Sequence, residues 1–497
     1  MSKIYMDRFN GTVFACLAEG NKLLEYHVET ERNASIIGNI YKGKVASVLD
    51  GMQAAFVGVG LDKNAYLSAD DIPQEAGDAL TADSSPALPA NLAVGDEIMV
   101  QAMKESFGTK GARVTATVSI AGRLLVYLPT FDFIGVSHKI ENLDKREKLT
   151  RLIEKIKPQG AGFIVRTAAE DAPKKAIETE AKSLISSFET VKKNYEKAPP
   201  FSVVYQESDL VTRMIRDVYT PEVEEIVVGD EKIYARLKEL SELLGKKLME
   251  KVRLHTDKVD LFRHAGLSNE IAKLTKNKVY MPGGSYLILD KTEALTAIDV
   301  NTGKFTGRDN LEETVFRVNM TAAKEIARQV RLRNVSGIVV VDFIDMEEES
   351  HRTLVVEALK EALKSDRCKC NVSGMTGFGL VEFTRKKIRR SVSSVLEKKC
   401  PHCDGSGFIR SDVFIMMQIR GEVMDLFAAG YQSVIVEANC GIVDYIRKSA
   451  VSPMLPKGME GKRLYFISHR TYHEEEFSVR GDNSPVLSLP DNALLLS

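Results

Sequence analysis

Two stretches of apolar residues predict β-strands, and the amphipathic segment between them predicts one long helix. Residues 293–301 and 337–345 each place an Asp after an apolar run, at Asp299 and Asp342. Residues 311–333 carry Glu side chains at the start and Arg side chains at the end, which suits a helix dipole. A strand, a crossover helix and a second strand form a right-handed unit, so we expect the two strands to run parallel.

Both Asp residues then lie at the carboxyl edge of one sheet, where ligands of α/β proteins usually bind. If the strands are neighbours, about 4.8 Å apart, the two carboxylates can bind one hard cation such as Mg²⁺. The alternative is that they are ordinary buried or helix-capping residues. Asp345 fits that alternative, because it opens a capping box that predicts a helix over 346–363. We expect Asp309 or Asn310 to cap the first helix.

The pattern elsewhere predicts an α/β protein of several domains. Alternating polar and apolar positions predict a hairpin in residues 1–35 and a small β-barrel in residues 36–120. A stretch rich in Ala, Asp, Ser and Pro over 73–91 predicts an insertion in the barrel. We expect the other regions in this order: an α/β stretch over 121–200 that ends in a helix over 174–197 before Pro199, a helix-rich stretch over 201–278, the Asp strands over 279–400, and a small α/β module over 411–497.

The composition is that of a globular protein, with 44% hydrophobic and 28% charged residues among 497. No apolar run reaches the roughly 18 residues that a membrane-spanning helix needs, and residues 1–10 lack the pattern of a signal peptide. Six Cys are too few for a disulfide framework in a chain of this length. We therefore expect a cytoplasmic protein with no membrane-spanning segment.

The charge balance is nearly even, but its distribution is not. The formal net charge of −1 argues against strong non-specific binding to nucleic acid. Basic residues nevertheless cluster over 385–390 and at Lys398 and Lys399. Such a cluster is either a nucleic-acid contact or only the solvated face of a helix.

Aromatic and basic residues of the predicted barrel suggest a surface for single-stranded nucleic acid. Phe56 and Tyr66 fall on successive strands, and Lys104 and Lys110 lie on a later hairpin. In OB-folds, bases stack on such rings and phosphates contact the ammonium groups. The alternative is that both rings belong to the core of the barrel.

A Cys-x-x-Cys turn at Cys400 and Cys403, followed by Gly405 and Gly407, has the spacing of half a zinc site. The same tetrapeptide occurs in redox motifs, but there it follows a strand and opens a helix. Here the glycines argue against a following helix, and a basic helix is expected before the turn. Because no second Cys pair follows, we expect a second chain to supply the missing ligands, which implies a dimer.

Two weaker signals remain. Arg166 and Thr167 end a predicted strand and offer a guanidinium and a hydroxyl that can bind a phosphate. Cys368 and Cys370 fall on one face of a predicted strand, where packing is a better explanation than metal binding.

In this order, the motifs closely resemble those of the ribonuclease E/G family of endoribonucleases, over nearly the whole chain. The resemblance is carried by residues 38–43, 51–57, 297–301 and 342–346 and by the Cys-Pro-x-Cys turn. It implies an α/β multidomain fold with these parts: an OB-fold RNA-binding barrel (36–120) inserted in an RNase H-like domain (1–35 and 215–278), a 5′-phosphate sensor region (121–214), a DNase I-like catalytic domain (279–399), a zinc link (400–410) and a small C-terminal α/β domain (411–497).

The resemblance also implies roles for single residues. Asp299 and Asp342 match Mg²⁺-binding carboxylates, and Asn301 matches a residue that orients the scissile phosphate or the attacking water. The remaining matches are RNA-binding positions of the barrel at Phe56, Tyr66, Lys104 and Lys110, a pocket for an RNA 5′-monophosphate at Gly122, Val126, Arg166, Thr167 and Lys369, and inter-subunit zinc ligands at Cys400 and Cys403.

Three positions depart from the pattern of the family. Tyr66 stands where Phe is common, which keeps the stacking face. Lys369 stands where Arg is usual, so we expect weaker or less selective sensing of the 5′ end, because Lys lacks the bidentate fork. Gly377 stands where a basic residue is common, which removes one RNA contact.

The implied function is a Mg²⁺-dependent endoribonuclease that is specific for single strands and stimulated by a 5′-monophosphate. It would act in RNA processing and decay (rRNA maturation and mRNA turnover) and leave 5′-phosphate and 3′-hydroxyl ends. We expect a homodimer through the Zn²⁺ link, with a tetramer as the alternative. One rival is an RNA-binding scaffold without catalysis, against which Asp299, Asn301 and Asp342 argue. A second rival, a DNA-cleaving phosphodiesterase, is left open by the sequence.

Overall fold

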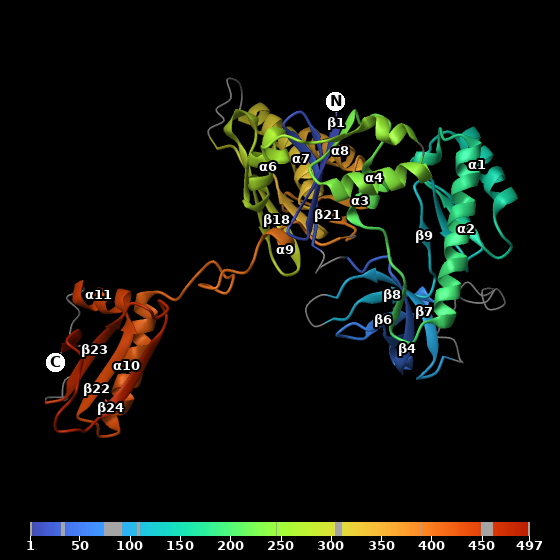
Figure 1. Cartoon of the computed structure of the whole chain (residues 1–497). Helices are drawn as coiled ribbons and strands as arrows, with labels where there is room; N and C mark the ends of the chain where they lie inside the picture. Colours follow the sequence, from blue (N-terminus) through green and yellow to red (C-terminus); the bar gives the residue numbers. More distant parts are fainter. Residues whose placement is uncertain are drawn as a thin grey trace. The chain divides into compact units, whose positions relative to one another are not determined.

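The computed structural model describes residues 2–30, 35–73, 92–106, 110–244, 246–303, 311–387, 389–448 and 461–495. The chain divides into two compact units, Met1–Leu396 and Glu397–Ser497 (Figure 1). Among the described residues, no helix is long and apolar enough to cross a membrane. Two predictions lie outside the description: the barrel insertion beyond Pro73, and the N-cap at Asp309 or Asn310.

The first sheet joins the start of the chain to a segment far along it. The predicted hairpin is an antiparallel set of β1 (Ser2–Phe9), β2 (Thr12–Glu19) and β3 (Lys22–Thr30). Strand β14 (Glu225–Val228) pairs with β1 in parallel, and β15 (Val252–Leu254) extends this edge. The helices of this region are α3 (Leu210–Arg213), α4 (Glu231–Leu244), α5 (Leu261–His264) and α6 (Ser268–Ala272). The strands of this sheet are therefore neighbours in space, although the barrel strands lie between β3 and β14 in the sequence.

The second sheet closes into a barrel. Its strands, in order, are β4 (Ile40–Leu49), β5 (Ala54–Gly58), β6 (Ala65–Ser68), β8 (Arg113–Thr115) and β7 (Glu97–Lys104), and β7 pairs back onto β4. Buried Val57, Leu67 and Val100 fill the interior. The predicted barrel is confirmed as an OB-like fold. Strand β13 (Ser202–Tyr205), from outside the predicted range, pairs with the first residues of β4.

The third sheet packs between the barrel and two helices. Its strands are β9 (Ile120–Ala121), β10 (Leu125–Leu128), β12 (Gly162–Val165) and β11 (Ile134–Val136), and its helices are α1 (Leu143–Ile156) and α2 (Lys174–Lys197). Helix α2 has the predicted bounds. Its buried side chains Phe188 and Val191 share a core with Ile40 of the barrel, and Figure 1 shows this helix running from the sheet to the barrel.

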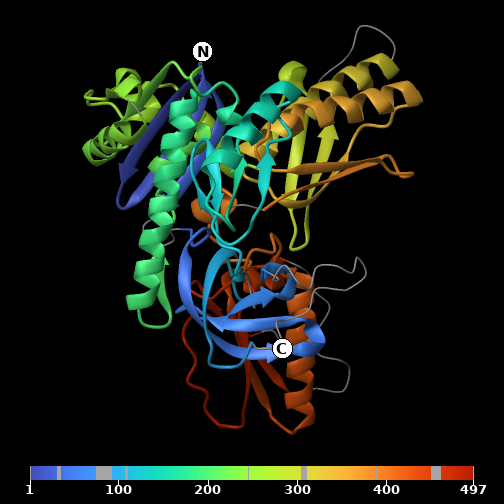
Figure 2. The ribbon, with the colours of Figure 1, turned by 90° about the vertical axis from the view of Figure 1, so that its right-hand side faces the viewer.

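The fourth sheet carries the two Asp strands. Its order is β16 (Lys278–Tyr280), β17 (Tyr286–Lys291), β18 (Leu295–Asn301), β19 (Gly337–Asp342), β21 (Leu380–Arg385) and β20 (Cys370–Met375). As predicted, β18 and β19 are parallel neighbours. Helices α7 (Leu311–Leu332) and α8 (Glu349–Lys364) lie side by side over one face (Figures 1 and 2). Ile298, Val300, Val339 and Val341 are buried in the core that includes these helices, so the side chains that alternate with them point to the opposite face.

The start of α8 differs from the prediction. The capping box at Asp345 is not formed, because the helix begins at Glu349 and its N-cap, Glu348, makes no side-chain cap bond. Instead, the carboxylate of Glu312 in the first turn of α7 accepts the N–H of Glu347 at 3.0 Å and that of Glu348 at 3.3 Å. A neighbouring helix thus supplies the cap, and the local sequence pattern does not reveal it.

The basic cluster over 385–390 is not a helix face. Arg385 ends β21, and its buried guanidinium lies 2.8 Å from the carboxylate of Asp366. The only helix described between this strand and the Cys-x-x-Cys turn is the short α9 (Ser393–Leu396), so the expected basic helix is absent from the described residues. The predicted strand for the other Cys pair is also too long, because Cys370 begins β20 and Cys368 precedes it.

The second unit has its own sheet, in the order β24 (Phe477–Asp482), β22 (Ser433–Asn439), β23 (Arg463–His469) and β25 (Ala493–Leu495). Its helices are α10 (Asp412–Ala428) and α11 (Cys440–Lys448). Ile419 and Val423 of α10 are buried against Val434 and Val436 of the sheet, which gives this unit a core of its own.

Candidate functional site

The parallel register places Asp299 and Asp342 directly opposite each other on neighbouring strands. Neighbouring strands lie about 4.8 Å apart, and both carboxylates are exposed on the face that the helices leave open. Asn301, two residues beyond Asp299 on the same face, donates from Nδ2 to Asp299 Oδ2 at 2.7 Å. The structure therefore brings all three residues together, as the sequence predicted.

The charge around this pair suits a hard cation. In the described part of the chain, no ion pair joins Asp299 or Asp342 to a Lys or Arg side chain. The described residues also contain no group of three or more His, Cys, Asp and Glu that could hold a metal. Mg²⁺ is commonly held by one or two carboxylates while it keeps several waters or phosphate oxygens. Two adjacent, solvent-facing carboxylates that have no cationic partner in the part of the chain that the structure describes fit that requirement.

A pocket of about 500 Å³ lies just beyond the end of β19. It is lined by Asp345, Arg352 and the turn between β20 and β21, where Phe378 is 92% exposed. A Cβ atom placed on Gly377 of this turn would meet no atom within 4 Å. The turn therefore has room for the basic side chain that the sequence lacks.

The four RNA-binding candidates of the barrel line one pocket of about 650 Å³. Phe56 and Tyr66 are a cross-strand pair of β5 and β6, with ring centroids 6.0 Å apart. Both rings are half-buried at the pocket wall, so they are not simply core residues. Lys104 and Lys110 lie on the same pocket, as predicted for a surface that binds a nucleic-acid strand.

Four of the five residues predicted for a 5′-phosphate pocket lie together at β9, β10 and β12. Arg166 donates from Nη1 to the carbonyl of Gly122 at 2.6 Å, and Val126 pairs with the strand that precedes Arg166. The hydroxyl of Thr167 is 2.9 Å from that of Ser137. Lys369 is exposed, and no hydrogen bond or ion pair joins it to this group within the described residues.

In the second unit, Cys400 and Cys403 lie in an exposed or half-exposed turn. The Cys403 sulfur accepts the N–H of Gly407 at 3.3 Å. The backbone N–H groups of Gly407 and Gly405 lower the pKa of Cys403, which favours the thiolate that zinc binds. Nearby, His473 Nε2 lies 2.7 Å from the carbonyl of His402. The turn offers two thiolates, and no third ligand joins them among the described residues.

Comparison with known proteins gives the family. A family model described as the ribonuclease E/G family matches residues 119–388. The chain is 36% identical over 471 residues to ribonuclease G of Haemophilus influenzae, covering 93% of this chain and 96% of that protein. The chain belongs to the ribonuclease E/G family.

Other members of the ribonuclease E/G family show the same likeness. Ribonuclease G of Escherichia coli (strain K12) is 36% identical over 468 residues, covering 93% of this chain and 96% of that protein. Ribonuclease E of the same strain is 32% identical over 483 residues, which cover 95% of this chain and only 45% of the longer protein. The range matched by the family model contains Asp299, Asn301, Asp342 and Arg166.

In this ribonuclease E/G family member, sequence reasoning missed the partner of Arg166. The carboxylate of Asp217 accepts from Arg166 Nη2 at 2.8 Å and from Arg216 Nη2 at 3.0 Å, and Arg389 Nη2 lies 3.9 Å away. Burial alone would raise the pKa of Asp217, but hydrogen bonds and charges from Arg216 and Arg166 hold it below its ordinary value. An RNA phosphate at Arg166 must therefore compete with a carboxylate.

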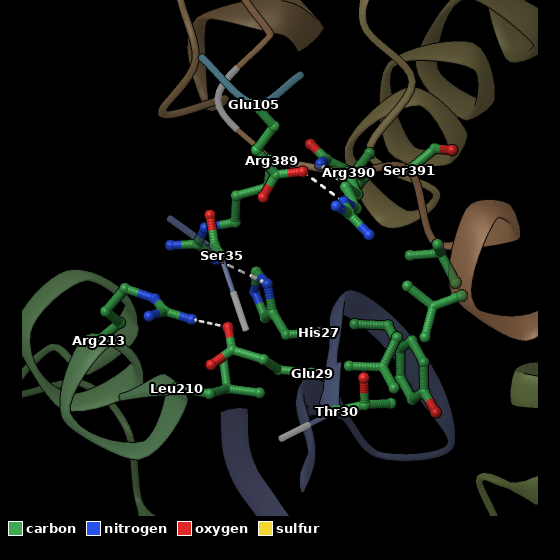
Figure 3. A pocket seen from close by; sticks show the side chains of 15 residues that line it. His27, Glu29, Thr30, Ser35, Glu105, Leu210, Arg213, Arg389, Arg390 and Ser391 are labelled. Atoms are coloured by element: carbon green, nitrogen blue, oxygen red, sulfur yellow. Dashed lines mark hydrogen bonds and ion pairs between the residues drawn. The ribbon is translucent and has the colours of Figure 1, made fainter. Parts of the chain in front are cut away.

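Arg389 was also missed, although it belongs to the basic cluster seen in the sequence. It lines the barrel pocket together with Lys387, and it also borders a cavity of about 60 Å³ (Figure 3). Its Nη1 donates to Nδ1 of His27 at 2.9 Å, and Nε2 of His27 is 3.2 Å from Glu25. Because Arg only donates, the proton of His27 must lie on Nε2, and burial lowers the pKa of this ring. Two ion pairs also line the cavity, Arg213 with Glu29 and Arg390 with Glu105, together with apolar side chains such as Val28 and Leu210.

Proposed function

We propose that this endoribonuclease of the ribonuclease E/G family cuts single-stranded RNA internally with one Mg²⁺ ion per chain, held by Asp299 and Asp342. The observation that carries the proposal is the parallel register that sets these two exposed carboxylates side by side, with no cationic partner among the described residues. The products would carry a 5′-phosphate and a 3′-hydroxyl. RNA processing and decay, including rRNA maturation and mRNA turnover, in the cytoplasm is the setting that we propose.

Different residues bind the metal ion, orient the reacting groups and hold the RNA. Asp299 and Asp342 provide the negative charge that holds the cation, and Asn301 fixes the orientation of Asp299 through its 2.7 Å hydrogen bond. Its amide can also orient the scissile phosphate or the attacking water. When bound, Mg²⁺ supplies charge neutralisation at the phosphate and acidifies a water molecule. The barrel pocket binds the RNA strand. Its bases stack on Phe56 and Tyr66, and its phosphates contact Lys104 and Lys110.

Stimulation by a 5′-monophosphate is part of the proposal. Arg166 is bonded to Gly122, and Thr167 follows Arg166 in the chain, so these residues are our candidates for contacting one phosphate group. The prior pairing of Arg166 with Asp217 and the exposed Lys369 in place of Arg both favour a modest response. We expect the 5′-phosphate advantage to be smaller than a free bidentate Arg would give.

Assembly through zinc is a separate part of the proposal. Each chain would contribute Cys400 and Cys403 to one tetrahedral Zn²⁺ shared with a second chain. Sedimentation together with metal analysis tests this part: the wild type should be a dimer, or a tetramer built from dimers, with one zinc per two chains. Cys403→Ser should be a monomer without zinc. A zinc-free dimer would contradict the link.

The experiment that tests the activity is cleavage of a short AU-rich single-stranded RNA with Mg²⁺. The RNA carries either a 5′-monophosphate or a 5′-hydroxyl, and the proteins are wild type and Asp342→Asn. Internal cuts by the wild type that disappear in the variant, with RNA binding retained, support the proposal. RNA binding without cutting by either protein would favour a scaffold instead. Cutting of the matching deoxy strand at a similar rate would favour a DNA-cleaving phosphodiesterase.

A further inference from the structure

The open face of the catalytic sheet carries three residues, beside the Asp pair, that the proposed mechanism does not use. Tyr280 of β16 pairs with Tyr286 of β17, and Tyr286 pairs in turn with Asn301 of β18. Residues directly opposite one another on antiparallel strands point to the same face. The two rings therefore continue the row that begins at Asn301, on the face that bears Asp299.

The two tyrosines and a lysine form one compact surface. The ring centroids of Tyr280 and Tyr286 are 6.1 Å apart, at an interplanar angle of 59°. The Nζ atom of Lys278 lies 3.6 Å from the ring centre of Tyr286 and 5.2 Å from that of Tyr280. Such a cation adds positive charge to an aromatic surface. We call Lys278, Tyr280 and Tyr286 the tyrosine platform.

Packing does not explain the platform. The side chains of β17 that enter the core are Leu287 and Leu289, which alternate with Tyr286. Tyr280 is 71% exposed, so its ring gains little from folding. Tyr286 is half-buried beside it. An aromatic pair at the surface with a neighbouring cation is the arrangement that proteins use to stack unpaired bases and contact the adjoining phosphate.

We infer that the tyrosine platform stacks a base of the substrate RNA next to the scissile phosphate, with Lys278 contacting the adjoining phosphate. This inference rests on the proposed function. Strands about 4.8 Å apart place Tyr286 one strand and Tyr280 two strands from Asn301, within reach of the nucleotide that adjoins a phosphate at the Asp pair. A base in a duplex is already stacked on both faces. The platform therefore also contributes to the preference for single strands.

Fluorescence of 2-aminopurine tests the stacking without cleavage. The full chain with Asp342→Asn is titrated into single-stranded RNAs, in EDTA, that carry 2-aminopurine at successive positions along the strand. Stacking should quench the fluorescence at one position. Adding Tyr280→Ala should remove the quench there and weaken the affinity roughly 5- to 150-fold, whereas Tyr280→Phe should retain the quench. An equal quench with Ala and Phe at residue 280 would overturn the inference.

Cleavage of abasic RNA gives the second test. Removing the base next to the cut should slow the wild type by roughly 5- to 150-fold but leave Tyr280→Ala equally slow on both RNAs. If the two proteins respond equally to the missing base, the platform does not bind it. Phe9→Ala serves as the matched control, because Phe9 is 77% exposed on a different sheet. A wild type that cuts no RNA would refute the proposed function, while the 2-aminopurine result would still decide the platform.

Discussion

The sheet that bears Asp299 and Asp342 and the group around Arg166 both carry charged side chains, but among the described residues only Arg166 has an opposite charge beside it. Asp299 and Asp342 face solvent, and Asp299 accepts a hydrogen bond from Asn301. Arg166, in contrast, already binds Asp217 and the carbonyl of Gly122. Pairing of β18 with β19 is enough to set Asp299 opposite Asp342, which is the arrangement that the proposed cation needs. Arg166, if it is to bind a phosphate as proposed, has to exchange Asp217 for it, so the affinity for the phosphate would depend on the strength of the Arg166–Asp217 ion pair.

The largest effect should follow from removing one carboxylate of the Asp299–Asp342 pair. Asp299→Asn should lower kcat/KM for RNA cleavage about 1,000-fold, because the metal supplies several kcal/mol of charge stabilisation. Rates are measured at saturating Mg²⁺, with RNA affinity measured in parallel and expected to be unchanged. Asp345→Asn is the matched control, since Asp345 is exposed just beyond the end of the neighbouring strand β19. An equal loss in both variants would contradict a special role for the pair.

The next largest effect concerns the stability that the ion pair between Asp217 and Arg166 gives to the folded protein. Asp217→Asn removes the carboxylate that Arg166 and Arg216 share, while Arg216 keeps its ion pair with Glu207. The loss should cost about 3 kcal/mol of unfolding free energy. The folded pKa of Asp217 is lowered, so its contribution is present above the ordinary Asp pKa of about 3.9 and is lost as the pH falls through the folded value. The difference in thermal midpoint between wild type and variant should be full at pH 7 and shrink in acid below about pH 4.

The control for this experiment is Glu189→Gln, which removes an exposed ion pair with Lys192. It should cost less than about 1 kcal/mol. A difference for Asp217→Asn that stays constant down to strongly acid pH would show that the ionised carboxylate is not what stabilises this region.

A smaller effect should appear in the response to the 5′ end. Arg166→Lys keeps the positive charge but loses the pair of guanidinium N–H groups that can bind one phosphate together. The rate advantage of 5′-monophosphate over 5′-hydroxyl RNA should therefore fall about tenfold or disappear. Asp217→Asn should act in the opposite direction, because it releases Arg166 to the phosphate. Both are measured as ratios of cleavage rates on paired substrates. An unchanged ratio in both variants would exclude Arg166 from 5′-end sensing.

The smallest effect should come from adding a positive charge in the turn between β20 and β21, near the Asp299–Asp342 pair. Gly377→Lys should tighten RNA binding about two- to fivefold at low salt, since the side chain enters open space beside β21. The gain should vanish at high ionic strength. Gly421→Lys, which also meets no atom within 4 Å, is the matched control in the second unit. An equal gain there would mean that added charge, not its position, is responsible.

The sequence predicts features that depend on local pattern and chain order. The strands of Asp299 and Asp342 and the helix over 174–197 follow from periodicity, and a crossover helix makes the strands parallel. The partner of Arg166 could not be found this way, because Asp217 lies in a separate segment with no pattern of its own. The same holds for Glu312, which caps a helix that it does not belong to.

The tyrosine platform shows the same limit. Tyr280 and Tyr286 are near each other in sequence, but their place beside Asn301 depends on the antiparallel pairing of β16, β17 and β18. Alternation alone does not say which strands will be neighbours. Similarly, Arg389 lies far along the chain from the barrel, and only the folded chain shows that it lines the same pocket as Phe56.

The order of synthesis gives the β18–β19 pairing a further meaning. Domains fold from the N-terminus as the chain leaves the ribosome, so the barrel strands β4 to β8 are complete before Asp342 has been made. Strand β19 also needs β21 at its other edge. A nascent chain therefore completes the four RNA-binding candidates of the barrel pocket before it contains both carboxylates of the Asp pair.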